Sequence, residues 1–139
     1  MHSRIFQMKS AISWWLFGPI ILMIMISGYF KFLEESNSIW ISLGVLLFIA
    51  SFLINTKYTI YSDGTLKVIS GFIPFPKINL HDITAVVYTR NPISSPALSL
   101  NRLAIYKGNS LLIIISPQNR EAFIEELKKF NASLSVVLK

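Results

Sequence analysis

The pattern of hydrophobic and polar positions divides this chain into two unlike parts. Residues 11–30 and 36–56 are two uncharged, densely apolar stretches, joined by a short polar connection at 31–35. A helix rises about 1.5 Å per residue, so about 20 residues cover the roughly 30 Å of a bilayer's hydrocarbon core. The pattern therefore predicts that residues 1–56 form a transmembrane hairpin of two antiparallel helices.

Residues 57–139 instead alternate apolar and polar positions in short runs that end at turn residues. The turns at Asp63-Gly64 and around Gly108 each separate two such runs and are typical of β-hairpins. Residues 117–130 place apolar side chains at helical spacing, after Ser116 as the expected helix cap and with Pro117 at the first helical position, which is typical of an amphipathic helix. We expect an α+β fold, with a cytoplasmic domain of at least six strands in an antiparallel barrel or strongly bent sheet, closed by one C-terminal helix. A short further strand is expected after Asn131.

Basic residues flank the two apolar stretches unequally. Arg4 and Lys9 precede the first stretch and Lys57 and Lys67 follow the second, whereas the connection contains only Lys31. Lysine and arginine accumulate in the cytoplasmic loops of membrane proteins. We therefore expect a multi-pass protein of the cell membrane with both termini in the cytoplasm. A cleaved signal peptide is the alternative for the first stretch, but its apolar run is too long and no Ala-x-Ala pattern follows it.

Composition favours the bilayer as the environment of the apolar stretches. Hydrophobic residues make up 53% of the chain and charged residues 14%, against roughly 25% charged residues in soluble domains. Membrane lipid is thus the expected partner of residues 11–56. The net charge of +6 comes from single, scattered bases rather than from basic runs, so we expect no nucleic-acid partner.

The chain lacks the residue patterns of catalytic and metal sites. It has no cysteine, and its two histidines, His2 and His81, have no partners at metal-ligand spacing. No nucleophile elbow or phosphate-binding glycine loop occurs, and neither apolar stretch contains an ionisable residue for a proton or ion pathway. We therefore expect no catalytic residue, no metal and no cofactor, which argues against an enzyme or a transporter.

The segment 90–102 is the least ordinary stretch of the predicted domain. Pro92 and Pro96 stiffen it and remove two backbone donors. One interpretation is a fixed connection whose leucines are buried and whose Asn101 and Arg102 bond nearby carbonyls. The other is a rigid loop pre-organised for a protein or peptide partner, because a stiff loop loses less entropy on binding. The candidate interaction residues are Arg90, Asn91, Ser94, Ser95, Asn101 and Arg102.

The same segment carries a resemblance to a known family. Residues 89–103 read Thr-Arg-Asn-Pro-Ile-Ser-Ser-Pro-Ala-Leu-Ser-Leu-Asn-Arg-Leu, and Ile115-Ser116-Pro117 and Phe123-Ile124 with Leu127 follow. In these residues the chain resembles the bacterial YyaB-like pleckstrin-homology (PH) domain membrane proteins, over most of its length. The resemblance implies hydrophobic spans followed by a PH-like barrel of antiparallel strands with a C-terminal helix. Members usually carry aspartate where this chain has Asn101, so the acidic neighbour of Arg102 is missing here.

Two functions fit these expectations. The first is a non-catalytic, membrane-anchored interaction or sensing module, whose hairpin holds the PH-like domain at the cytoplasmic face. The alternative is a self-protection protein against membrane-active peptides or envelope stress, which would act through the hairpin alone. Specific inositol-lipid recognition is not expected, because the loop at 62–65 is short and contains an acid where such recognition needs several bases.

Overall fold

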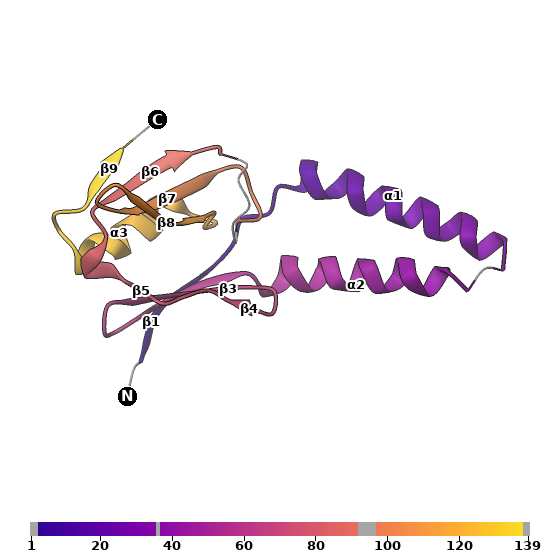
Figure 1. Cartoon of the computed structure of the whole chain (residues 1–139), viewed down its shortest axis with the longest axis horizontal. Helices are drawn as coiled ribbons and strands as arrows, with labels where there is room; N and C mark the ends of the chain where they lie inside the picture. The colour runs from indigo at the N-terminus through magenta and orange to yellow at the C-terminus, as the bar shows by residue number, and fades with distance from the viewer. Residues whose placement is uncertain (1–2, 36, 92–96, 138–139) are drawn as a thin grey trace.

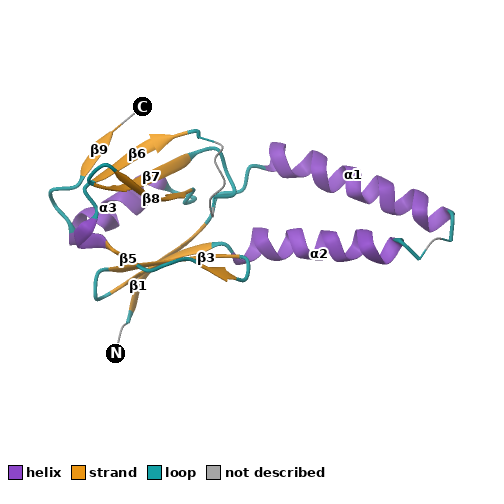
Figure 2. Ribbon diagram, in the orientation of Figure 1, coloured by secondary structure: helices purple, strands orange, loops and turns teal. Residues whose placement is uncertain are grey.

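The computed structural model describes residues 3–35, 37–91 and 97–137. Two helices, α1 (Trp14–Leu33) and α2 (Ile39–Asn55), project side by side from one end of a β-rich domain (Figure 1 and Figure 2). They run antiparallel, and their connection lies at the end far from the domain. We call α1 and α2 the helix pair.

The helix pair meets the criteria for membrane-crossing segments only in part. Of the helices in the described residues, α1 is the one long and apolar enough to cross a bilayer, whereas α2 is apolar but has only 17 residues. Helix α1 also begins later than the apolar stretch, and before it the Ala11 N–H donates to the Ser116 carbonyl at 2.6 Å. The structure thus supports the first predicted span, and the second span and the transmembrane hairpin remain predictions.

The β-rich domain contains two sheets. In the first sheet, β2 (Lys57–Tyr61) and β3 (Thr65–Ser70) form the hairpin predicted around Asp63-Gly64. Gly64 adopts a φ of +75° at this turn, which glycine reaches without steric cost. The remaining strands of this antiparallel sheet are β1 (Arg4–Lys9) beside β2, and β4 (Ile73–Pro74) and β5 (Ile78–Asn79) beside β3.

The second sheet has the strand order β8 (Ser110–Ile115), β7 (Arg102–Lys107), β6 (Ala85–Thr89) and β9 (Ser135–Val137). Strand β9 is the short strand expected after Asn131, and it lies parallel to β6.

The predicted barrel does not close. Among the described strands, no hydrogen-bonded ladder joins the first sheet to the second. Strands β4 and β5 have two residues each, and Pro74 and Pro76 lack the N–H that a longer ladder would need. The chain therefore leaves the first sheet through the short helix η1 (Leu80–Asp82) and starts a separate sheet.

Strand β1 belongs to the domain although it precedes α1. It pairs with β2, the first strand after α2, and Lys9 lies directly opposite Lys57. Phe6 and Met8 pack against the core, and the Phe6 ring lies 6.3 Å from the ring of Phe123. The sequence prediction begins the domain at residue 57 and misses β1, because six residues are a weak alternating signal. The helix pair is thus inserted between two neighbouring strands of one sheet.

The hydrophobic core collects inward-facing residues of both sheets and of helix α3 (Arg120–Phe130). This helix starts after the predicted Pro117, because the Asn119 side chain accepts the hydrogen bond from Ala122 N–H and so caps it. Ser116 is not the cap. The residues of α3 that are buried, as their helical spacing predicted, are Phe123, Ile124 and Leu127.

Candidate functional site at the helix–domain junction

Three buried hydroxyl groups meet where the helix pair joins the domain. Ser10 follows β1, Tyr58 lies in β2 and Ser116 follows β8. The Tyr58 hydroxyl donates to Ser10 Oγ at 3.1 Å and accepts from Ser116 N–H at 3.1 Å. The Oγ atoms of Ser10 and Ser116 are 2.9 Å apart. These three residues, which we call the hydroxyl cluster, connect both sheets to the start of the helix pair.

Residues 97–101 are held against the same cluster. The Leu98 N–H donates to Ser10 Oγ at 3.4 Å. Ser13, the residue before α1, donates from its Oγ to Ser99 Oγ at 3.0 Å and from its N–H to the Leu98 carbonyl at 3.1 Å. The beginning of α1 is therefore fastened to this loop as well as to β2.

Burial also sets the protonation of the junction. Burial raises the pKa of the Tyr58 hydroxyl, and hydrogen bonds with Ser10 and Ser116 partly offset that rise. Tyr58 therefore keeps its proton at neutral pH and can donate it to Ser10. Burial lowers the pKa of the Arg102 guanidinium, which nevertheless stays charged at neutral pH because arginine is so strong a base.

Arg102, one of the candidate interaction residues, lies in the interior. Its guanidinium donates to the Ser99 carbonyl at 2.6 Å and to the Asn91 carbonyl at 2.7 Å, and more weakly to the Ala97 carbonyl at 3.3 Å. It thus braces both described ends of the segment 90–102. Leu98 is buried, as the structural interpretation of that segment expects, whereas Leu100 is only half-buried and Asn101 is exposed.

The other candidates differ in their exposure. Arg90 and Asn101 are exposed, and Asn91 is half-buried. Ser94 and Ser95 lie outside the described residues. Of the described candidates, Arg90 and Asn101 are therefore the two whose side chains are open to a partner.

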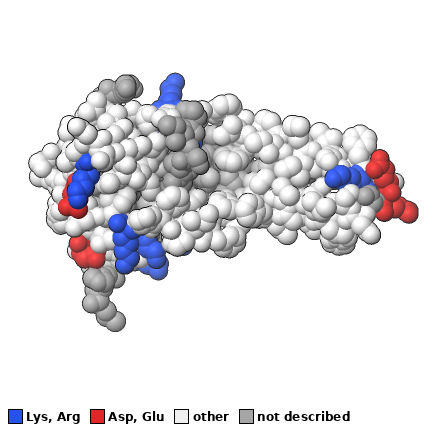
Figure 3. All heavy atoms as spheres, in the orientation of Figure 1, with Lys and Arg blue, Asp and Glu red and all other residues white. Residues whose placement is uncertain are grey.

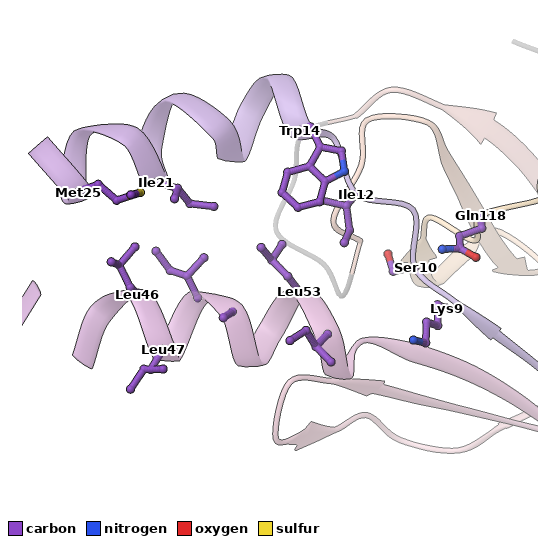
Figure 4. A pocket seen from close by; sticks show the side chains of 13 residues that line it. Lys9, Ser10, Ile12, Trp14, Ile21, Met25, Leu46, Leu47, Leu53 and Gln118 are labelled. Carbon is purple, nitrogen blue, oxygen red and sulfur yellow. The ribbon is translucent and has the colours of Figure 1, made fainter. Parts of the chain in front are cut away.

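A cavity of about 630 Å³ opens between the two helices at their domain end (Figure 4). Trp14, Ile21 and Met25 of α1 point into it from one side, and Leu46 and Leu53 of α2 point into it from the other. Its domain end is polar, with side chains of Lys9, Ser10 and Gln118. The cavity is therefore apolar along the helices and polar at one end.

Three lysines share the outer face of the first sheet, and one of them, Lys9, also lines this cavity. Lys9 and Lys57 are cross-strand partners, and Lys67 lies on the next strand, opposite Thr59. The period-2 geometry of strands puts all three on one face, which we call the lysine face. Among the described residues none of the three forms an ion pair.

The charge distribution of the whole surface is uneven (Figure 3). On the visible face, blue basic side chains gather on the domain over the first sheet. The helix pair shows no charge between the domain and its far tip, where basic and acidic side chains lie together. On this face the helix pair is therefore uncharged along its length, and charged side chains lie only at its far tip and on the domain.

An apolar rim surrounds the domain end of the helix pair. Trp14 and Trp15 at the start of α1 are 64% and 67% exposed, and Phe72 in the turn between β3 and β4 is 71% exposed. This turn lies against α2, since a Cβ built on Gly71 would approach the Phe52 ring to 2.9 Å. Trp15 and Phe72 are therefore exposed at the level where α1 and α2 meet the domain, and Trp14 is exposed there while it also lines the cavity.

His81 and Asp82 do not form a catalytic pair. The His81 ring packs against Phe130 with ring centroids 6.5 Å apart, and the Asp82 carboxylate pairs with Lys107 at 2.9 Å. Among the described residues no three histidine, cysteine, aspartate or glutamate side chains could hold a metal ion. What the junction offers is a cavity, a basic face and an apolar rim, which are features of binding.

Sequence reasoning missed most of this junction. It assigned Ser116 to a helix cap and gave Ser10 and Tyr58 no role, although these residues meet from three distant parts of the chain. No sequence spacing connects them. The aromatic pair Trp14-Trp15 is the part that the sequence does predict, because aromatic rings at the ends of apolar stretches are typical of a membrane interface, and both side chains are exposed.

The described residues thus form a small β-rich domain with the helix α3 packed on its core, and a cavity and exposed aromatic side chains lie at its junction with the helix pair. Residues 56–131, more than half of the chain, match the family model of the bacterial PH domain, and the chain therefore belongs to the bacterial PH domain family. PH domains are generally non-catalytic modules that bind lipids or proteins. No curated protein and no solved structure matches the chain.

Proposed function

We propose that this chain is a membrane-anchored PH domain whose helix pair crosses the bilayer as a hairpin and whose domain works as a non-catalytic interaction module at the cytoplasmic face. The observation that carries the proposal is the exposure of the helix pair. No described residue of α1 or α2 is buried, although both helices are almost wholly apolar. Exposed apolar surface costs roughly 25 cal/mol per Å² in water, so a pair of this kind requires an apolar environment.

The aromatic side chains support this placement. Trp14, Trp15 and Phe72 are exposed at the domain end of the helix pair, and Tyr29 and Trp40 are exposed near the far end. Tryptophan and tyrosine collect at both membrane–water interfaces because they have apolar bodies and polar tips, and the wholly apolar Phe72 adds hydrophobic surface at the same level. Two groups of exposed aromatic side chains, separated by the uncharged length of the helix pair, fit two helices that span the bilayer. The resemblance to YyaB-like membrane proteins supports the same placement.

The pairing of β1 with β2 supports a common side for both flanks of the helix pair. Residues in neighbouring strands of one sheet cannot be separated by a bilayer, so 4–9 and 57–137 lie together. Arg4, Lys9, Lys57 and Lys67 occur on these flanks, and the rule that basic residues stay inside makes that side the cytoplasm.

Alkaline carbonate extraction of cell membranes tests the anchor. The full chain should stay in the membrane pellet, because carbonate strips off only surface-bound proteins. A variant in which an Asn-Gly turn replaces residues 11–55 should move to the supernatant. Recovery of the full chain in the supernatant would contradict the proposal.

The partner of the module is proposed to be a protein or peptide that contacts the exposed end of the segment 90–102. A photo-cross-linking side chain placed at Arg90 or Asn101 should capture this partner in native membranes, and the same side chain at Lys128 on α3 is the control. Equal capture at all three positions would mean that the segment 90–102 does not contact the partner specifically. The alternative role in self-protection would need only the helix pair. It predicts that a chain ending after α2 still protects cells fully against membrane-active peptides or envelope stress.

A further inference from the structure

We propose that the cavity between α1 and α2 holds one acyl chain of an anionic glycerophospholipid, with the lipid phosphate against Lys9. This inference rests on the proposed membrane anchor. The inference goes beyond the membrane anchor because it adds a specific lipid site, which the helix pair and the domain form jointly.

The shape of the helix pair provides the space for a chain. Near the far end the helices are close, since a Cβ built on Gly28 of α1 would lie 3.5 Å from Ser42 of α2. Toward the domain they separate, and a Cβ on Gly18 would meet nothing within 4 Å. The resulting wedge of about 630 Å³ falls in the size range of small-ligand sites, roughly 300 to 1,000 Å³.

The lining of the cavity matches an amphiphile. Along the wedge the side chains come from apolar residues of both helices, over the roughly 16 Å of helix between Trp14 and Met25. At the domain end Lys9 and Gln118 are exposed, and both carry hydrogen-bond donors. An extended peptide would have to leave backbone groups unpaired in so apolar a wedge, whereas an acyl chain has no such groups.

The charge at the polar end selects an anion. Lys9 lies directly opposite Lys57, and like charges in a cross-strand pair repel each other. Lys67 adds a third base on the same face. A phosphate beside Lys9 would relieve this repulsion, and the short distance from β1 to α1 puts Lys9 at the level of the lipid headgroups when the helices span the bilayer.

Quenching of Trp14 fluorescence by brominated lipid tests the site. Trp15→Phe and Trp40→Phe leave Trp14 as the single tryptophan of the full chain. This chain is reconstituted in phosphatidylcholine vesicles in which one-tenth of the lipid carries brominated acyl chains, either as phosphatidylglycerol or as phosphatidylcholine. The proposal expects stronger quenching by the brominated phosphatidylglycerol at equal content, because bromine quenches at contact and Trp14 lines the cavity.

Two variants, each with a control, separate the contribution of the lipid headgroup to binding from that of the acyl chain. Lys9→Gln should weaken the preference for phosphatidylglycerol about five-fold, the factor that corresponds to roughly 1 kcal/mol for one base, whereas Lys128→Gln on α3 should leave it unchanged. Ala50→Phe should fill the cavity and abolish the preference, whereas Gly44→Phe, on a part of α2 that does not line the cavity, should not.

Equal quenching by the two brominated lipids would overturn the proposal and mean that bulk lipid fills the wedge. Quenching by neither lipid, with Trp14 emission that shifts on dilution into excess lipid, would also overturn it and make a second copy of the chain the occupant. Both results leave the anchor intact. If carbonate releases the full chain from membranes, the anchor itself fails and the lipid site fails with it.

Discussion

The Ser10 hydroxyl is a small group on which several parts of the junction depend. It accepts hydrogen bonds from the Tyr58 hydroxyl and from the Leu98 N–H, and it contacts Ser116. Because it is buried, no water can replace it when it is removed. Arg102 is buried as well, and removal of its guanidinium would leave the carbonyls that it binds without a donor.

Replacing Ser10 with alanine should lower the free energy of unfolding of the domain by about 1 to 3 kcal/mol, the cost of buried polar groups left without partners. Chemical denaturation of the full chain in detergent micelles measures this. Ser62→Ala removes an exposed hydroxyl and should change the free energy by less than about 0.5 kcal/mol. Equal effects of the two substitutions would mean that the hydroxyl cluster is not stabilising.

Tyr58 should make the stability of the domain depend on pH above about 10, the ordinary pKa of tyrosine. Burial raises the pKa of Tyr58 in the folded state, so above that pH the unfolded state loses the proton first. The unfolded state then binds fewer protons than the folded state, and the free energy of unfolding falls as the pH rises.

Tyr58→Phe provides the comparison. It should be less stable than the natural chain at neutral pH, because Ser116 N–H and Ser10 Oγ lose their hydrogen bonds to the phenol. The difference in free energy of unfolding should shrink between pH 10 and pH 11, since phenylalanine does not titrate. A difference that stays constant over this range would contradict the assigned shift.

At the scale of elements, the central feature is that β1 and β2 are sequence-distant neighbours. Ser10 N–H donates to the Thr56 carbonyl at 3.1 Å, so the two ends of the helical insertion meet as the ends of a hairpin would. Phe6 and Met8 of β1 also pack on the core that α3 completes. A domain cut at residue 57 therefore loses an edge strand and part of its core.

An Asn-Gly turn in place of residues 11–55 should restore a continuous β1–β2 hairpin, because this dipeptide suits two-residue hairpin loops. We expect this variant to unfold cooperatively in thermal melts followed by circular dichroism. The fragment 57–139 should melt at a lower temperature or not fold, since it exposes the core side chains that Phe6 and Met8 cover, at a cost of about 2 kcal/mol or more. Equal melting temperatures would show that β1 adds nothing to the domain.

At the scale of the whole molecule, the pairing of β1 with β2 constrains the membrane topology: either both helices cross the bilayer or neither does. The sheet forms only when both flanks of the helix pair are on one side. A single crossing by α1 alone, with α2 outside the bilayer core, would separate β1 from β2 and destroy the sheet.

Topology reporters test this directly. Alkaline phosphatase, which is active only outside the cytoplasm, should be inactive when fused after Lys139 and active when fused after Ser38, between the helices. A fluorescent protein that matures in the cytoplasm should give the opposite pattern at both positions. Phosphatase activity after Lys139 would contradict the cytoplasmic placement of the domain, and activity after neither position would contradict the hairpin.

The sequence by itself determined the elements whose signals are local. The two helices, the hairpin at Asp63-Gly64 and the amphipathic face of α3 follow from periodicity and turn residues, which act over a few neighbouring positions. The buried Arg102 also matches one of the two interpretations of its segment, because its neighbours in sequence supply the carbonyls that it binds.

The tertiary structure alone decided what depends on distant pairs. β1 carries too few residues for a clear pattern and becomes a strand only because β2 offers it a partner on the far side of the helix pair. The hydroxyl cluster and the cavity likewise need residues from distant parts of the chain. The three lysines read as scattered in sequence, and strand pairing gathers them on one face, because a sheet brings together positions that no local spacing relates.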